Sequence, residues 1–123
     1  MKNWTDRKIL VAEDEMGNFF LIACMLEESG IMITHAENGK KAVDLATNEP
    51  FDVILMDIKM PLLDGFEATA EIRKNNIDIP ILAQSAFAYK REECIAAGFT
   101  DYLAKPFNEA KLVEMITQYL KGV

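Results

Sequence analysis

Five polar residues stand directly after short apolar segments, in positions where they could do chemistry together. They comprise three carboxylates, a hydroxyl and an ammonium group: Glu13, Asp14, Asp57, Ser85 and Lys105. Carboxylates gathered at one place raise one another's pKa unless a cation neutralises them. Oxygen ligands without histidine or cysteine favour Mg²⁺, with Mn²⁺ as the alternative, over Zn²⁺.

The lysine and the hydroxyl extend this chemistry toward phosphate. Lys105 supplies a point charge suited to a phosphoryl oxygen. A metal ion, a lysine and a hydroxyl around a carboxylate are the groups that stabilise a phosphoryl group during transfer. Each residue alone would be weak evidence, because a carboxylate after a strand often caps a helix. Together they predict phosphoryl transfer to a carboxylate.

The elements that must position these residues alternate along the chain. Short apolar segments predict strands at Ile9–Glu13, Met32–Ala36, Val53–Asp57, Ile79–Ser85 and Tyr102–Ala104. Apolar residues at every third or fourth position predict helices at Met16–Ser29, Lys40–Asn48, Phe66–Asn75, Tyr89–Ala97 and Asn108–Leu120, with Asn38, Asp64 and Asn108 as N-caps. Right-handed crossovers then give an α/β fold, a doubly wound parallel sheet whose ligand site lies at the carboxyl ends of the strands.

Composition sets the broad class of the protein. The chain has 123 residues, half of them hydrophobic, and a formal net charge of -7. This length and composition predict one globular domain, residues 1–123. The negative charge argues against binding of nucleic acid or an anionic membrane by this domain. Without an apolar run of about 20 residues or a signal peptide, the expected location is cytoplasmic.

Three residues that often do chemistry are assigned structural roles. Cys24 and Cys94 are expected to be buried, inert thiols, since two lone cysteines suit a reducing compartment. His35, the one histidine, stands at the end of the second strand and is expected to lie away from the polar edge. It is therefore interpreted as structural rather than as a phosphorelay histidine.

Four sequence segments carry a resemblance to a known family. They are ILVAEDE (9–15), ILMDIKMPLLDGFEA (54–68), ILAQSAFA (81–88) and DYLAKPF (101–107). In this order and spacing the chain resembles the receiver domains of two-component response regulators. The resemblance runs from Lys8 to Leu120 and implies a flavodoxin-like fold with five strands in the order 2-1-3-4-5 and five helices.

The resemblance implies a role for each residue of the metal and acceptor set. Asp57 resembles the phosphoacceptor, whose carboxylate takes a phosphoryl group from a phosphohistidine. Asp14 would be a direct Mg²⁺ ligand, together with Asp57 itself. Glu13 would act through a metal-bound water, and the backbone carbonyl of Lys59 would complete the set.

The remaining family positions concern the phosphoryl oxygens and the switch. Ser85 and Lys105 would each contact a phosphoryl oxygen, and Pro106 would follow a cis peptide bond. Tyr102 stands at the switch position and would turn inward when Ser85 moves. The switch would change the surface formed by the fourth helix, the fifth strand and the fifth helix.

Two residues stand at positions that vary within the family and tune hydrolysis of the aspartyl phosphate. These are Lys59 and Phe87, each two residues beyond a site residue. We hypothesise that Phe87 shields the phosphoryl group from water and lengthens its lifetime. A side chain that fills a protein interface is the alternative for this position.

The resemblance also implies partners and leaves alternatives open. A histidine kinase or a histidine phosphotransfer protein would donate the phosphoryl group, and the chain could be part of a hybrid sensor kinase or stand alone. The switch surface could also hold a second copy. Such a domain is not a turnover enzyme. The alternatives are a degenerate receiver acting only as an interaction module, an aspartate-nucleophile phosphohydrolase, which Lys59 disfavours, and a flavin protein, whose phosphate the acidic segment 13–15 would repel.

Overall fold

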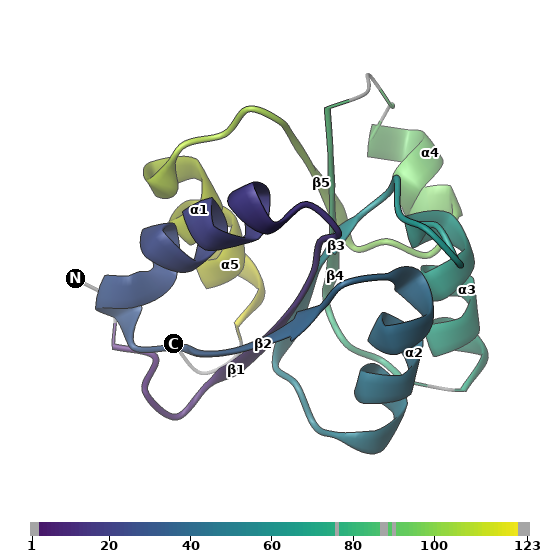
Figure 1. The fold of residues 1–123 in the computed structure, drawn as a ribbon, viewed down its shortest axis with the longest axis horizontal. Coiled ribbons are helices and arrows are strands. Elements are labelled where there is room, and N and C mark those ends of the chain that lie inside the picture. Colours follow the sequence, from purple (N-terminus) through teal and green to yellow (C-terminus); the bar gives the residue numbers. More distant parts are fainter. Residues whose placement is uncertain (1–2, 76, 87–88, 90, 121–123) are drawn as a thin grey trace.

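The sheet is parallel and has five strands. The computed structural model describes residues 3–75, 77–86, 89 and 91–120 (Figure 1). The strands are β1 (Lys8–Ala12), β2 (Met32–Ala36), β3 (Val53–Asp57), β4 (Ile81–Ser85) and β5 (Asp101–Ala104). They lie in the order β2-β1-β3-β4-β5, and all four neighbouring pairs are parallel. The predicted fold class and strand order are confirmed.

The helices follow the strands in alternation. They are α1 (Met16–Leu26), α2 (Gly39–Asn48), α3 (Gly65–Lys74), α4 (Arg91–Ala96) and α5 (Glu109–Tyr119), with a 3₁₀ turn, η1 (Glu27–Ser29), after α1. The side chains of Asn38, Asp64 and Asn108 each accept a backbone N–H bond from the first turn, so the three predicted N-caps are confirmed. The predicted first helix was too long, because its last residues tighten into η1 before Gly30, whose φ is 75°.

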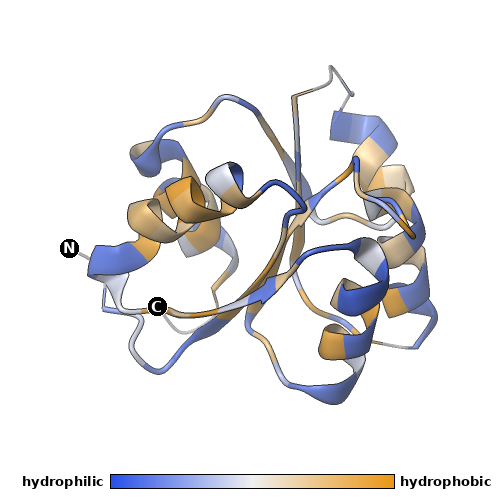
Figure 2. Ribbon diagram, in the orientation of Figure 1, coloured by the Kyte–Doolittle hydropathy of each residue, from blue (hydrophilic) through white to orange (hydrophobic). Residues whose placement is uncertain are grey.

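The helices cover both faces of the sheet. In Figure 1, α1 and α5 lie on one side and α2, α3 and α4 on the other. One buried cluster contains Leu10, Ile54 and Ile81, and the other contains Val11 and Leu82. Figure 2 shows hydrophilic residues over much of α2, whereas α1 is hydrophobic along most of its length and exposes Phe20 and Leu21. Burial on both faces explains why the inner strands β1, β3 and β4 have no regular polar alternation.

The two cysteines differ in their surroundings. Cys94 is buried as predicted, but Cys24 is exposed, so the prediction for Cys24 was wrong. The reason is that α1 turns Ile22 and Leu26 toward the sheet, which leaves Cys24 on its outer side. Within the described ranges, no helix has both the length and the apolar character needed to cross a membrane.

Candidate functional site

Three carboxylates meet at the carboxyl edge of the sheet. Glu13 and Asp14 follow β1, and Asp57 is the last residue of β3, the neighbour of β1. One carboxylate oxygen from each of the three lies within 4.8 Å of the others. Glu13 and Asp57 are buried, whereas Asp14 is exposed. Because parallel strands end at the same edge, residues 44 positions apart in sequence become neighbours here.

Lys105 reaches into this cluster from the loop after β5. Its Nζ lies 2.9 Å from Oε1 of Glu13 and 3.5 Å from Oδ2 of Asp57. The backbone N–H of Lys105 donates to the carbonyl of Ser85 at 2.9 Å, and the Lys105–Pro106 peptide bond is cis. The ammonium group therefore lies against both buried carboxylates.

The electrostatics of the site favour an added cation. Burial and the neighbouring carboxylate of Glu13 raise the pKa of Asp57 to about 7, although the ammonium group of Lys105 acts in the opposite direction. A carboxyl group with this pKa is only partly ionised at neutral pH when no further cation is bound. One lysine thus leaves the cluster with excess negative charge.

The donor set fits a hard divalent cation. All three side chains offer oxygen atoms, which Mg²⁺ and Mn²⁺ prefer. The exposure of Asp14 gives the cluster an open side, where water molecules could complete the shell of a metal such as Mg²⁺. A metal here would neutralise the charge that raises the pKa of Asp57.

The other predicted site residues lie around this edge of the sheet. Ser85 is the buried last residue of β4, next to the neighbour of Asp57 across the sheet, and Lys59 is exposed two residues after β3. Tyr102 on β5 is half-buried and packs against the hydrophobic core between the sheet and α4, which includes Cys94. Phe87 lies outside the described residues. The structure thus brings Glu13, Asp14, Asp57 and Lys105 into one cluster, with Ser85 and Lys59 at its border.

His35 lies nearer to the acidic cluster than predicted. Its Nε2 is 2.7 Å from the backbone carbonyl oxygen of Glu13, and its ring stacks on Phe19 with centroids 3.9 Å apart. The expectation that His35 lies away from the polar edge was wrong, since β2 is parallel to β1 and ends at the same edge. The half-buried ring, tied to backbone and stacked on an aromatic residue, agrees with a structural role.

Gly65 also shapes the site, although its place in the sequence did not predict a role there. A Cβ atom on Gly65 would lie 2.4 Å from the carbonyl oxygen of Asp57 and 2.7 Å from Cα of Ile58. The N–H of Gly65 donates to the carbonyl of Ile58 at 2.6 Å. The start of α3 can therefore lie this close to the end of β3 only without a side chain at position 65.

Comparison with known proteins identifies the family of this chain and agrees with its fold. The family model described as response regulator receiver domain matches residues 9–117. The chain belongs to this family. The receiver domain of sensor histidine kinase PA1611 from Pseudomonas aeruginosa, solved with a magnesium ion in the active site cleft, has 40% identity and a TM-score of 0.84, over 93% of this chain and 97% of that one.

Other matches are a receiver domain crystallised with a partner protein and kinases much longer than this chain. The receiver domain of Ssk1 from Saccharomyces cerevisiae, crystallised with the phosphotransfer protein Ypd1, is 28% identical with a TM-score of 0.85, over 93% of this chain and 88% of that one. Hybrid signal transduction histidine kinase I from Dictyostelium discoideum is 42% identical over 95% of this chain. The chain spans 7% of the length of that kinase and 13% of the sensor protein GacS from Pseudomonas syringae.

Proposed function

We propose that residues 1–123 act as a single receiver domain whose phosphoacceptor is Asp57. The observation that carries this proposal is the meeting of three carboxylates and Lys105 at the carboxyl edge of the sheet. Membership of the receiver family supports the same function. The domain works as a signalling module rather than as a turnover enzyme.

In the proposed reaction, a carboxylate oxygen of Asp57 attacks the phosphorus atom of a phosphohistidine on a histidine kinase or a histidine phosphotransfer protein. The new O–P bond forms as the P–N bond breaks, and the electron pair of that bond returns to the imidazole. Lys105 offsets charge on the phosphoryl oxygens, and Ser85 donates a hydrogen bond to one of them. The crystallised pair of Ypd1 and the receiver domain of Ssk1 supports a partner of this kind.

Glu13, Asp14, Asp57 and the backbone carbonyl of Lys59 are the proposed holders of Mg²⁺. When bound, the metal supplies positive charge that offsets the charge of the acceptor carboxylate and of the incoming phosphoryl group. Glu13 is tied to Lys105 and accepts a hydrogen bond from the backbone N–H of Glu15 at 3.2 Å. These ties suit a residue that holds a metal-bound water in place. The receiver domain of PA1611, with its magnesium ion, supports this assignment.

The proposed output is a change of the surface formed by α4, β5 and α5. Ser85 moves toward the phosphoryl group, and Tyr102 turns further into the space beside β5. Tyr102 is half-buried, so a rotation inward would bury more of its ring without a large movement of the backbone. A local change of charge would thereby reach a surface that partners can contact.

The test is phosphorylation of the protein by acetyl phosphate with Mg²⁺, followed by intact-mass spectrometry. Wild type is expected to gain one phosphoryl group, and Asp57→Asn none. Asp64→Asn is the matched control, because asparagine also caps a helix and Asp64 contacts the first turn of α3. Labelling of Asp57→Asn to the extent of wild type would show that the acceptor assignment is wrong.

A further inference from the structure

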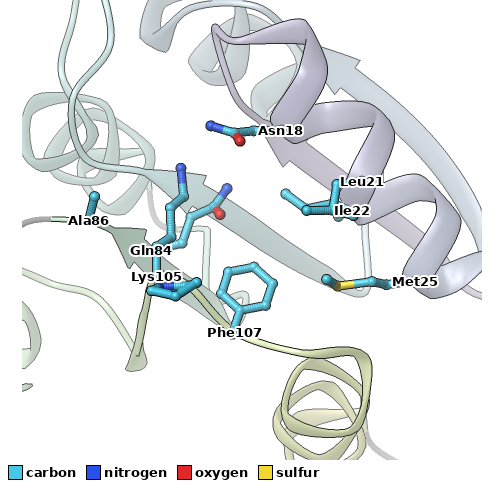
Figure 3. A pocket seen from close by; sticks show the side chains of 9 residues that line it. Asn18, Leu21, Ile22, Met25, Gln84, Ala86, Lys105 and Phe107 are labelled. Atoms are coloured by element: carbon cyan, nitrogen blue, oxygen red, sulfur yellow. The ribbon is translucent and has the colours of Figure 1, made fainter.

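A largely apolar hollow lies between α1 and the loop that follows β5, beside the acidic cluster. Its volume is about 340 Å³, and its apolar lining includes Leu21, Ile22, Met25 and Phe107. Figure 3 shows these side chains facing a common space, with Lys105 at its border. A hollow of this size is at the lower end of the range for small-molecule sites, about 300–1,000 Å³.

Gln84 is one of three polar side chains that line the hollow, with Asn18 and Lys105. It lies on β4 two residues after Leu82, so it points to the same face of the sheet, and it lines the hollow. Figure 3 shows its amide directed toward α1. The residue is 0% exposed, yet neither Nε2 nor Oε1 of Gln84 has a hydrogen-bond partner in the described structure. A buried polar group without a hydrogen-bond partner is destabilising, so a ligand that pairs with it gains binding free energy.

The charges around the hollow favour a neutral ligand. Lys105 is already paired with Glu13 at 2.9 Å and with Asp57 at 3.5 Å. An anion in the hollow would compete with these two carboxylates for the same ammonium group. A cation would lie against that ammonium group and against apolar side chains, where desolvation is costly.

The amide of Gln84 specifies the polar part of such a ligand. The carboxamide of Gln84 donates through Nε2 and accepts through Oε1, which lie side by side. A ligand group that has an acceptor atom next to a donor atom can therefore pair with both. Primary amides and lactams have this arrangement. Leu21, Met25 and Phe107 would then contact the apolar body of the ligand.

We propose that the hollow between α1 and the loop after β5 is a binding site for a small, neutral aromatic amide, which pairs with the carboxamide of Gln84. The site lies beside the acidic cluster, and Lys105, which belongs to that cluster, also lines the hollow. Binding requires neither Mg²⁺ nor a phosphoryl donor, so its test is independent of the proposed phosphoacceptor function.

The experiment is an NMR titration of the amide resonances of the whole chain with benzamide, and separately with acetophenone. Acetophenone keeps the ring and the carbonyl group but replaces the NH₂ donor by a methyl group. We expect saturable shifts around residues 18–25, Gln84 and Phe107, and binding of benzamide about tenfold tighter than that of acetophenone, the value of one hydrogen bond. Equal affinities, shifts spread over other faces, or none up to the solubility of benzamide would overturn the proposal.

A substitution then assigns the preference to Gln84. Gln84→Leu keeps similar side-chain volume and removes the amide, so it should bind both compounds equally. Gln118→Leu makes the same chemical change on the exposed side of α5 and should keep the tenfold preference. A preference that persists in Gln84→Leu would contradict the proposed pairing. If that variant does not fold, as judged by circular dichroism, the comparison of the two compounds on wild type still decides the matter.

Discussion

The Nζ atom of Lys105 lies 2.9 Å from Oε1 of Glu13, although the two residues are 92 positions apart in the sequence. This ion pair joins the loop after β5 to the loop after β1 across the carboxyl edge of the sheet. Glu13 has a side-chain exposure of 1% and Lys105 one of 17%. The pair is therefore screened less by water than a surface salt bridge, and its removal should be measurable.

The first prediction concerns the loss of this ammonium group. Lys105→Met should lower the free energy of unfolding without Mg²⁺ by about 2 kcal/mol. This is less than the 3–5 kcal/mol typical of a broken buried pair, because Asp57 can take up a proton in the variant. Mg²⁺ should recover part of the loss, since the metal neutralises the same carboxylates. Urea unfolding with and without Mg²⁺ measures both effects.

The control for this experiment is Lys111→Met on the exposed side of α5. The control should unfold like wild type, to within about 0.5 kcal/mol. If Lys105→Met unfolded like the control, both with and without Mg²⁺, the ion pair would contribute nothing to stability.

A second prediction follows from the contact between Gly65 and the end of β3. Gly65→Ala would place Cβ 2.4 Å from the carbonyl oxygen of Asp57, so the start of α3 must move away from the strand. We expect a loss of more than about 2 kcal/mol in unfolding free energy, and changed amide chemical shifts at Asp57 and Ile58.

Gly17→Ala on α1 is the matched control for the change at Gly65. Its Cβ would meet only the carboxylate end of Glu15, which can move aside. The Glu15 carboxylate caps α1 by accepting a hydrogen bond from the backbone N–H of Asn18 at 2.9 Å. We expect a change within about 1 kcal/mol, because the favourable helix propensity of alanine opposes any loss of this bond. Equal effects of the two substitutions would contradict the argument from close packing.

The candidate site could be predicted from the sequence because its polar residues stand at the ends of apolar segments that form strands. Asp57 and Ser85 each end an apolar segment, and parallel strands bring such ends to one edge. Cys24 was not predictable in this way, since α1 is apolar on most of its circumference and its buried stripe is ambiguous in the sequence. The unpaired amide of Gln84 depends on which side chains surround it, and the sequence does not specify those contacts.

The third prediction concerns the metal. Mg²⁺ that binds only the folded protein should stabilise it by RT ln(1 + [Mg²⁺]/Kd), about 2.7 kcal/mol at a hundred times Kd. Asp14→Asn should lose most of this stabilisation, because it removes the exposed carboxylate of the cluster. Thermal unfolding over a series of Mg²⁺ concentrations measures the effect. Asp6→Asn is a control outside the cluster and should respond as wild type does; an equal response of Asp14→Asn would remove Asp14 from the ligand set.

The last prediction concerns Asp101, the first residue of β5, which joins β5 to α4 and α5. Its carboxylate accepts hydrogen bonds from Nε of Arg91 at 2.8 Å, from the hydroxyl of Tyr119 at 2.5 Å and from the backbone N–H of Tyr102 at 2.8 Å. Burial alone would raise the pKa of Asp101, but these three bonds outweigh burial, and the pKa is lowered from its ordinary value of 3.8.

Because the pKa of Asp101 is lowered in the folded state, the free energy of unfolding should depend on pH in a definite direction. The folded protein holds the ionised form more strongly than the unfolded chain does, so Asp101 contributes its full stability above about pH 5 and loses it as the pH falls through the folded pKa. Asp101→Asn should therefore cost about 1–3 kcal/mol at pH 7. The cost should shrink progressively below pH 4, as measured by urea unfolding at each pH. Asp44→Asn on the exposed side of α2 should show no such trend, and a constant cost of Asp101→Asn from pH 7 to pH 3 would show that its charge is not what stabilises this junction.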